Sequence, residues 1–180
     1  MFVSGGLDHI DGAYDAYALH AMYLGAADAL ATLRAMRDVG PPTATIGTQE
    51  FRTALRAAIE NSIAVTTLRK LRQISDALVV VSPTPLADTQ FPAFRKRLTE
   101  LNLANPLAAL FAEECSAVCR SLGAKFVPQP PETLAADGLA TRAEYTKGAA
   151  RFSARAAEGD IMHMNAQYGA AVIEKLMAAL

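Results

Sequence analysis

Apolar residues along this chain fall into two alternating patterns. Short runs rich in Ala, Leu, Val and Phe occupy residues 15–20, 76–82 and 125–127. The run over 76–82 is apolar without alternation, as expected of a parallel strand covered on both faces. We therefore predict a strand at each of the three runs, and Phe2-Val3 suggests a fourth, shorter one.

Between these runs, hydrophobic residues recur every three or four positions, which is typical of helices with one buried face. Thr48 is a good N-cap for one helix, and Asn105 followed by Pro106 suits the start of another. Helices are expected over residues 25–36, 48–71 with a break near 61–62, 94–101, 105–123 and 165–179. The predicted inner stripe of the last helix consists of Ala166, Ala170, Ile173 and Leu176/Met177.

This order of elements predicts one α/β domain over residues 1–180. Strands that alternate with helices favour a three-layer αβα fold with a parallel sheet and helices on both faces. Such sheets bind ligands beyond the carboxyl ends of their strands. The segments after His20, Val81 and Val127 should therefore share one rim, joined by the segment before the last helix.

Composition narrows the class of function. The net charge is −1 and 19% of the residues are charged, so the chain lacks the excess of Lys and Arg typical of nucleic-acid binding. No run approaches the roughly 20 apolar residues needed to cross a bilayer. The first residues lack the pattern of a signal peptide. We expect a cytoplasmic protein whose partner is neither a nucleic acid nor a membrane.

No metal or cofactor is expected either. Cys115 and Cys119 are four positions apart on a predicted helix, and reduced, partly buried thiols are the favoured interpretation. Asp8-His9, Asp11 and His20 lack metal-ligand spacing, so a polar loop is the better interpretation for the first three.

The most informative pair is Asp160 and His163, three positions apart just before the last helix. One helical turn would bring both side chains to the same side. The carboxylate could then accept the imidazole Nδ1–H, which leaves Nε2 free as a general base. This is the arrangement of an acid–histidine–nucleophile triad, although Asp-x-x-His alone is a weak signal that also suits a solvated turn or a helix cap.

The run from Gly159 to Gly169, Gly-Asp-Ile-Met-His-Met-Asn-Ala-Gln-Tyr-Gly, resembles the C-terminal block of SGNH (GDSL-type) hydrolases. Residues 79–86 and 128–138 resemble the family's fourth-strand and fifth-strand segments with their exit loops. The resemblance covers residues 76–180 well and residues 1–40 loosely. It implies a flavodoxin-like fold, an acyl-ester substrate, and His163 and Asp160 as base and acid.

Two family motifs are missing. The family's nucleophile lies in a Gly-Asp-Ser block, and neither this block nor a Gly-x-Ser-x-Gly elbow occurs here. The family's oxyanion-hole Asn is also absent, because the corresponding strand end reads Leu19-His20-Ala21-Met22. The resemblance therefore implies the base without the nucleophile.

Three sources of a nucleophile remain open. Ser4 precedes Gly5 and Gly6, whose backbone N–H groups could bind an oxyanion, although Ser-Gly-Gly also suits a plain turn. Ser82 ends the clearest strand. The favoured option is a first strand missing from an N-terminally incomplete chain, which would leave strand edges unpaired.

These arguments lead to three hypotheses. The first is an SGNH-like acyl-ester hydrolase, with His20 and Asn165 as weaker substrate-binding candidates. The second is a non-catalytic SGNH-fold domain that binds a ligand or a protein on the same rim. The third is a homo-oligomer in which the exposed strand edge of one chain is completed by another.

Overall fold

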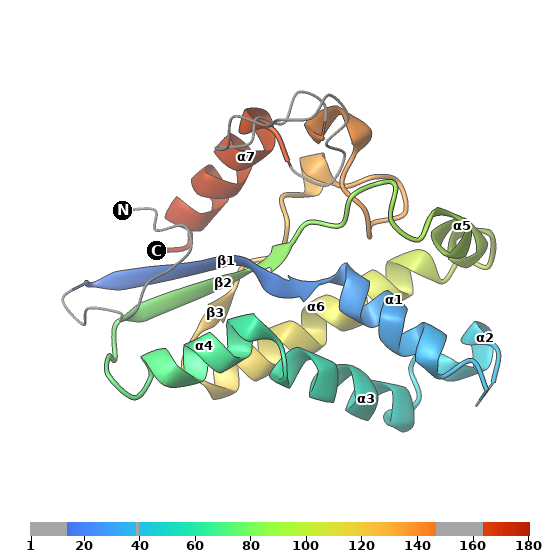
Figure 1. Cartoon of the computed structure of the whole chain (residues 1–180), viewed down its shortest axis with the longest axis horizontal. Coiled ribbons are helices and arrows are strands. Elements are labelled where there is room, and N and C mark those ends of the chain that lie inside the picture. Colours follow the sequence, from blue (N-terminus) through green and yellow to red (C-terminus); the bar gives the residue numbers. More distant parts are fainter. Residues whose placement is uncertain (1–13, 39, 147–163) are drawn as a thin grey trace, which may run out of the picture.

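A three-stranded parallel sheet organises the chain (Figure 1). The computed structural model describes residues 14–38, 40–146 and 164–180. Within these ranges the strands are β1 (Ala16–Gly25), β2 (Leu78–Thr84) and β3 (Lys125–Phe126), in the order β1-β2-β3. The three predicted strands are thus confirmed, while Phe2-Val3 lies outside the described residues.

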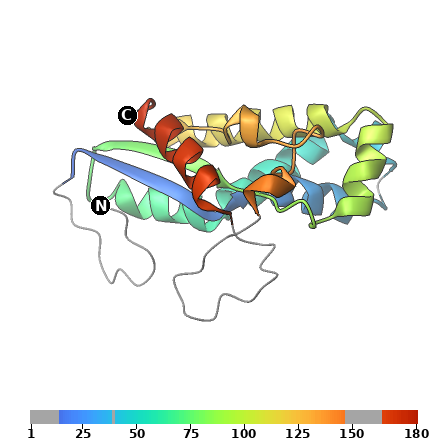
Figure 2. The same ribbon diagram turned by 90° about the horizontal axis from the view of Figure 1, so that it is seen from above.

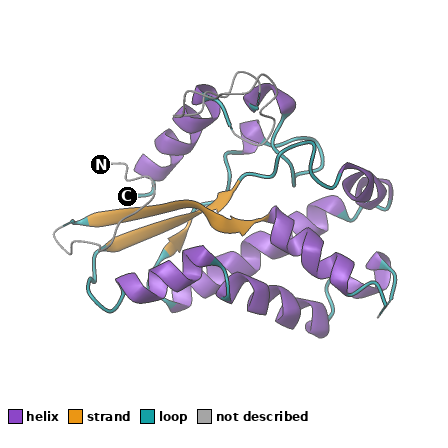
Figure 3. Ribbon diagram, in the orientation of Figure 1, coloured by secondary structure: helices purple, strands orange, loops and turns teal. Residues whose placement is uncertain are grey.

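Helices cover both faces of the sheet, so the predicted mixed α/β architecture is confirmed (Figure 3). One face carries most of the helices, and α7 lies on the other, as the two views show (Figures 1 and 2). No described helix is both long and apolar enough to cross a bilayer. The helices are α1 (Ala26–Ala35), α2 (Pro42–Thr45), α3 (Gln49–Glu60), α4 (Ile63–Leu71), α5 (Pro92–Glu100), α6 (Ala104–Ser121) and α7 (Ala166–Met177), with short 3-10 turns η1 (Pro131–Thr133) and η2 (Ala143–Tyr145).

Some helix starts follow from local side-chain caps. The Thr48 and Ser62 hydroxyls accept the N–H groups of Phe51 and Val65, which confirms the predicted cap and the predicted break near residue 61. The predicted cap at Asn105 is wrong, because α6 begins at Ala104 and Leu103 occupies the cap position. The Asn105 side chain instead lies against the backbone of Gly138.

The helix-rich face holds the larger core. Leucine and valine side chains of β1 and β2 meet the inner faces of α1, α3, α4 and α6 there. Cys115 and Cys119 lie in this core as free thiols, and burial raises the pKa of both, that of Cys119 to about 11. The prediction of free thiols is therefore confirmed, and both are buried completely rather than partly.

α7 builds a smaller core on the opposite face. Tyr168, Val172 and Leu176 pack against Val80 and Val127. The predicted stripe of α7 is correct only at Leu176, and Ile173 is 41% exposed. The larger Tyr and Val side chains bury more apolar surface than the two alanines would, so they determine which face of α7 turns inward.

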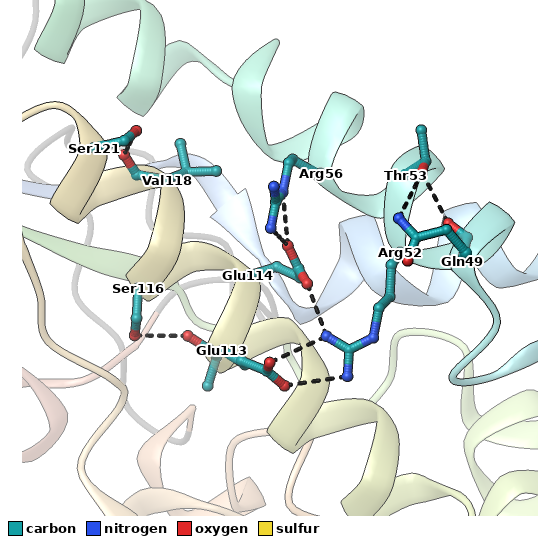
Figure 4. Close-up of polar contacts among 10 residues, drawn as sticks. Gln49, Arg52, Thr53, Arg56, Glu113, Glu114, Ser116, Val118 and Ser121 are labelled. Carbon is teal, nitrogen blue, oxygen red and sulfur yellow. Dashed lines mark hydrogen bonds and ion pairs between the residues drawn. The ribbon is translucent and has the colours of Figure 1, made fainter.

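A buried carboxylate joins α3 to α6 (Figure 4). Glu114 is nearly inaccessible, and Arg56 donates to its Oε2 through Nε and Nη2 at 2.8 and 2.7 Å. Arg52 donates to Glu114 Oε1 at 3.0 Å and also reaches Glu113. The two helices beneath the sheet are thereby fixed to each other by charge as well as by apolar contact.

Candidate functional site

The end of the regular part of β1, the end of β2 and the segment after β3 meet around one small hollow. Its volume is about 10 Å³, which is room for about one water molecule, and His20 and Ser82 from β1 and β2 line it together with Gln129 from the segment after β3. Tyr168 and Lys175 of α7 complete the wall. The shared rim expected from the sequence is therefore present, and α7 closes it on one side.

His20 and Ser82 are register partners in the parallel pairing of β1 with β2. Their Nδ1 and Oγ atoms share a hydrogen bond of 2.6 Å. Burial lowers the pKa of His20, because the surrounding protein disfavours the charged imidazolium. A neutral imidazole bonded to a hydroxyl could act as a hydrogen-bond partner or a base, but Ser82 is only 3% exposed.

β1 becomes irregular directly after His20. Ala21 and Tyr23 have φ angles of 53° and 51°, a region that residues with a Cβ seldom adopt, and the pairing register shifts between His20 and Gly25. A Cβ on Gly25 would lie 2.5 Å from the Thr84 carbonyl oxygen, so only glycine fits there. Strained backbone of this kind is concentrated at functional sites in proteins, which adds to the interest of the rim.

The hydroxyl of Tyr168 is buried and has no hydrogen-bond partner in the described part of the chain. Burial raises the pKa of this phenol, so the proton remains on the oxygen and is available for donation. An unpaired buried polar group costs on the order of 1–3 kcal/mol. Such a donor in the wall of a hollow is typical of a site that receives a polar ligand atom or a solvent molecule.

Asn165, a predicted substrate-binding residue, caps α7. Its Oδ1 accepts the Tyr168 N–H at 3.1 Å, and its Nδ2 donates to the Glu144 carbonyl at 2.9 Å. Its own N–H donates to the Tyr145 carbonyl at 2.7 Å. These contacts tie the start of α7 to η2, and a substrate role for Asn165 stays a prediction.

The segment after β3 is held by contacts of Asp137 that no sequence pattern indicates. Asp137 accepts the N–H groups of Leu139 and Ala140, and Arg95 Nε donates to it at 2.7 Å. Burial alone would raise the pKa of Asp137, but these N–H donors and the guanidinium outweigh it and lower that pKa. Asp137-Gly138 was a visible turn signal, whereas its partner Arg95 lies 42 residues away and has no local signature.

The remaining predicted site residues, namely Asp160, His163, Ser4, Gly5 and Gly6, lie outside the described ranges. Asp8, His9 and Asp11 lie outside them too. Within residues 14–38, 40–146 and 164–180, no group of three His, Cys, Asp or Glu side chains is placed to hold a metal ion.

The described geometry thus consists of a strand-end rim with a histidine–serine hydrogen bond, a strained strand end and a buried phenol donor. Each of these features is observed in this chain itself and does not depend on a comparison with another protein. Comparison with protein-family models, with curated proteins and with solved structures returns no match for this chain.

Proposed function

We propose that this chain is an SGNH-like acyl-ester hydrolase domain with Asp160 and His163 as its acid–histidine pair. The observation that carries the proposal is the position of α7. The Asp-x-x-His run directly precedes this helix, and the first turn of the helix brings Tyr168 into the same hollow as His20. The proposal puts its base at this end of α7, on the side of the strand ends, where open parallel sheets bind ligands.

The strand order supports the finer, flavodoxin-like part of the proposal. β1, β2 and β3 are parallel and adjacent in sequence order. This agrees with the last three strands of a sheet ordered 2-1-3-4-5. In that arrangement, the outer edge of β1 is where the first strand of the fold would pair.

In the proposed reaction, Nε2 of His163 takes the proton of a serine hydroxyl while the serine oxygen attacks the ester carbonyl. Asp160 accepts the Nδ1–H and stabilises the imidazolium. The alcohol leaves with the proton from His163, and water then releases the acid from the acyl-enzyme by the same steps. The substrate class is a small acyl ester, and the reaction needs no metal or organic cofactor.

Ser4 is the internal candidate for the nucleophile, and the N–H groups of Gly5 and Gly6 are the candidates for oxyanion donors. His20 and Asn165 would contact the substrate. His20 already lies at the rim, with the lowered pKa of a neutral imidazole, which suits a hydrogen bond to a polar substrate atom.

One observation favours a second function. The serine that lines the described hollow, Ser82, is buried and bonded to His20, so it is poorly placed to attack a substrate. This favours a non-catalytic SGNH-fold domain that binds a ligand or protein partner on the same rim.

A fluorophosphonate probe, which labels activated serines, separates the two functions. We expect the wild type to be labelled, His163→Ala to lose the label, and the control His9→Ala to keep it. Peptide mass spectrometry of the labelled chain identifies the serine, and circular dichroism verifies that each variant is folded. A folded wild type that takes no label excludes the hydrolase and leaves the binding domain. Labelling that depends on His20 rather than His163 would also contradict the proposed pair.

A further inference from the structure

The outer edge of β1 pairs with no strand in the described part of the chain (Figure 2). The Asp15 carbonyl accepts the Leu78 N–H at 3.3 Å and therefore points toward β2. Backbone groups alternate in direction along a strand. The N–H and C=O groups of Ala16, Ala18 and His20 consequently point away from β2, toward the free edge.

From Ala16 to His20, this edge lacks the features that keep strand edges from pairing. Natural proteins protect edges with charged residues, prolines, bulges or very short strands. β3, at the other side of the sheet, has two residues and contains Lys125. β1 has ten residues without a charge or a proline, and its irregular part begins only after His20.

The sheet face beside this edge is also incompletely covered. Ala18 is exposed and Leu78 is 39% exposed, whereas Val80 is buried beneath α7. Parallel strands are ordinarily covered on both faces. A neighbour that joins the edge of β1 would place further side chains next to this apolar strip.

We propose that the neighbour is a second copy of this chain, paired antiparallel through β1 across a two-fold axis at Ala18. Ala18 then lies opposite the partner's Ala18, and its outward N–H and C=O exchange two hydrogen bonds with that residue. His20 lies opposite the partner's Ala16, and Tyr17 lies opposite the partner's Leu19. Each large side chain of this register meets a smaller or aliphatic one, and no charge opposes another, so the strand is complementary to itself as a two-fold interface requires.

Substitutions at Ala18 test the register, because Ala18 is the one residue of this pairing that meets its own copy. Ala18→Lys and Ala18→Glu each place like charges opposite one another, and the exposed position tolerates either side chain in the monomer. Ala57→Lys, at an exposed alanine of α3, is the matched control. Sedimentation velocity over about two decades of concentration measures the dissociation constant.

We expect a wild-type dimer, an unchanged control, and a dissociation constant raised at least about tenfold in each single variant. An equimolar mixture of the Ala18→Lys and Ala18→Glu chains should recover the dimer, since opposite charges then face each other. A wild type that is monomeric at all concentrations overturns the proposal. It is overturned equally if hydrogen exchange of that monomer shows the β1 edge to be protected by residues 1–13 of the same chain. A dimer that persists in both variants overturns it as well, because the contact then lies elsewhere.

Discussion

Glu113 and Glu114 are neighbours on α6 and both bind Arg52, but their surroundings differ sharply. The side chain of Glu114 is 3% exposed, and that of Glu113 is 62% exposed. Two guanidinium groups hold Glu114, and the Arg56 pair is bidentate on a single oxygen at 2.7 and 2.8 Å. Replacement of each glutamate by glutamine therefore compares a buried with an exposed carboxylate at nearly the same place (Figure 4).

Glu114→Gln should lower the free energy of unfolding by about 2–3 kcal/mol. Removal of one partner from a fully buried ion pair costs roughly 3–5 kcal/mol. The cost is smaller here, because Arg52 and Arg56 are partly exposed and regain water when the carboxylate is lost. The glutamine amide also turns an N–H donor toward an arginine that has only donors, so it replaces at most one of the lost bonds.

Glu113→Gln should cost at most about 1 kcal/mol, the usual value of an exposed ion pair. Urea unfolding followed by circular dichroism measures both differences, and thermal unfolding should show a shift of about 4–12 °C for the buried variant. Equal losses in the two variants would refute the reasoning, because burial would then not control the strength of the contact. An unchanged Glu114→Gln variant would refute it too.

Three further predictions concern the rim and the segment after it. Gly25→Ala should destabilise the fold by about 1–3 kcal/mol, because its Cβ would meet a backbone oxygen of β2, whereas Gly169→Ala, with open space around it, should be neutral or stabilising in the same urea unfolding assay. Burial lowers the folded pKa of His20, so the free energy of unfolding should fall as the pH drops below about 6.5 toward that lower pKa. His20→Asn, which can still bond Ser82, should make the free energy of unfolding less dependent on pH in this range, as measured by urea unfolding at a series of pH values. An unchanged pH dependence in the variant would contradict the assignment to His20. The folded pKa of Asp137 is also lowered, but from a carboxylate value, so the stabilisation that its carboxylate provides should be complete above about pH 4 and lost in acid. Asp137→Asn should remove this stabilisation, so the free energy of unfolding of the variant should change less with pH in the acid range than that of the wild type.

Elements with a local signal could be predicted from the sequence. Thr48 indicates the start of α3, because its hydroxyl accepts the N–H of Phe51, only three residues further on. The uninterrupted apolar run of β2 indicates a strand that is covered on both faces. The meeting of His20 and Ser82 at one rim followed from strand order alone, since parallel strands end on the same side.

Features that depend on distant partners could not be predicted. Glu114 and Arg56 are 58 residues apart, and nothing near either one indicates the contact. β1 was expected to end at His20 but continues to Gly25, through two non-glycine residues with left-handed backbone that no propensity favours. The face of α7 was misjudged because helical spacing fitted two stripes, and only the space above Val80 selects between them.

α7 has its own small core, separate from the larger one beneath the sheet. Tyr168 and Leu176 belong both to that core and to the wall of the hollow. An element held by few buried contacts exchanges its amide hydrogens earlier than the rest of a protein. We therefore expect the amides of α7 to exchange before those of α1, α3, α4 and α6, which share the larger core, so that α7 is the wall of the rim whose opening would bring solvent to the polar groups beneath it.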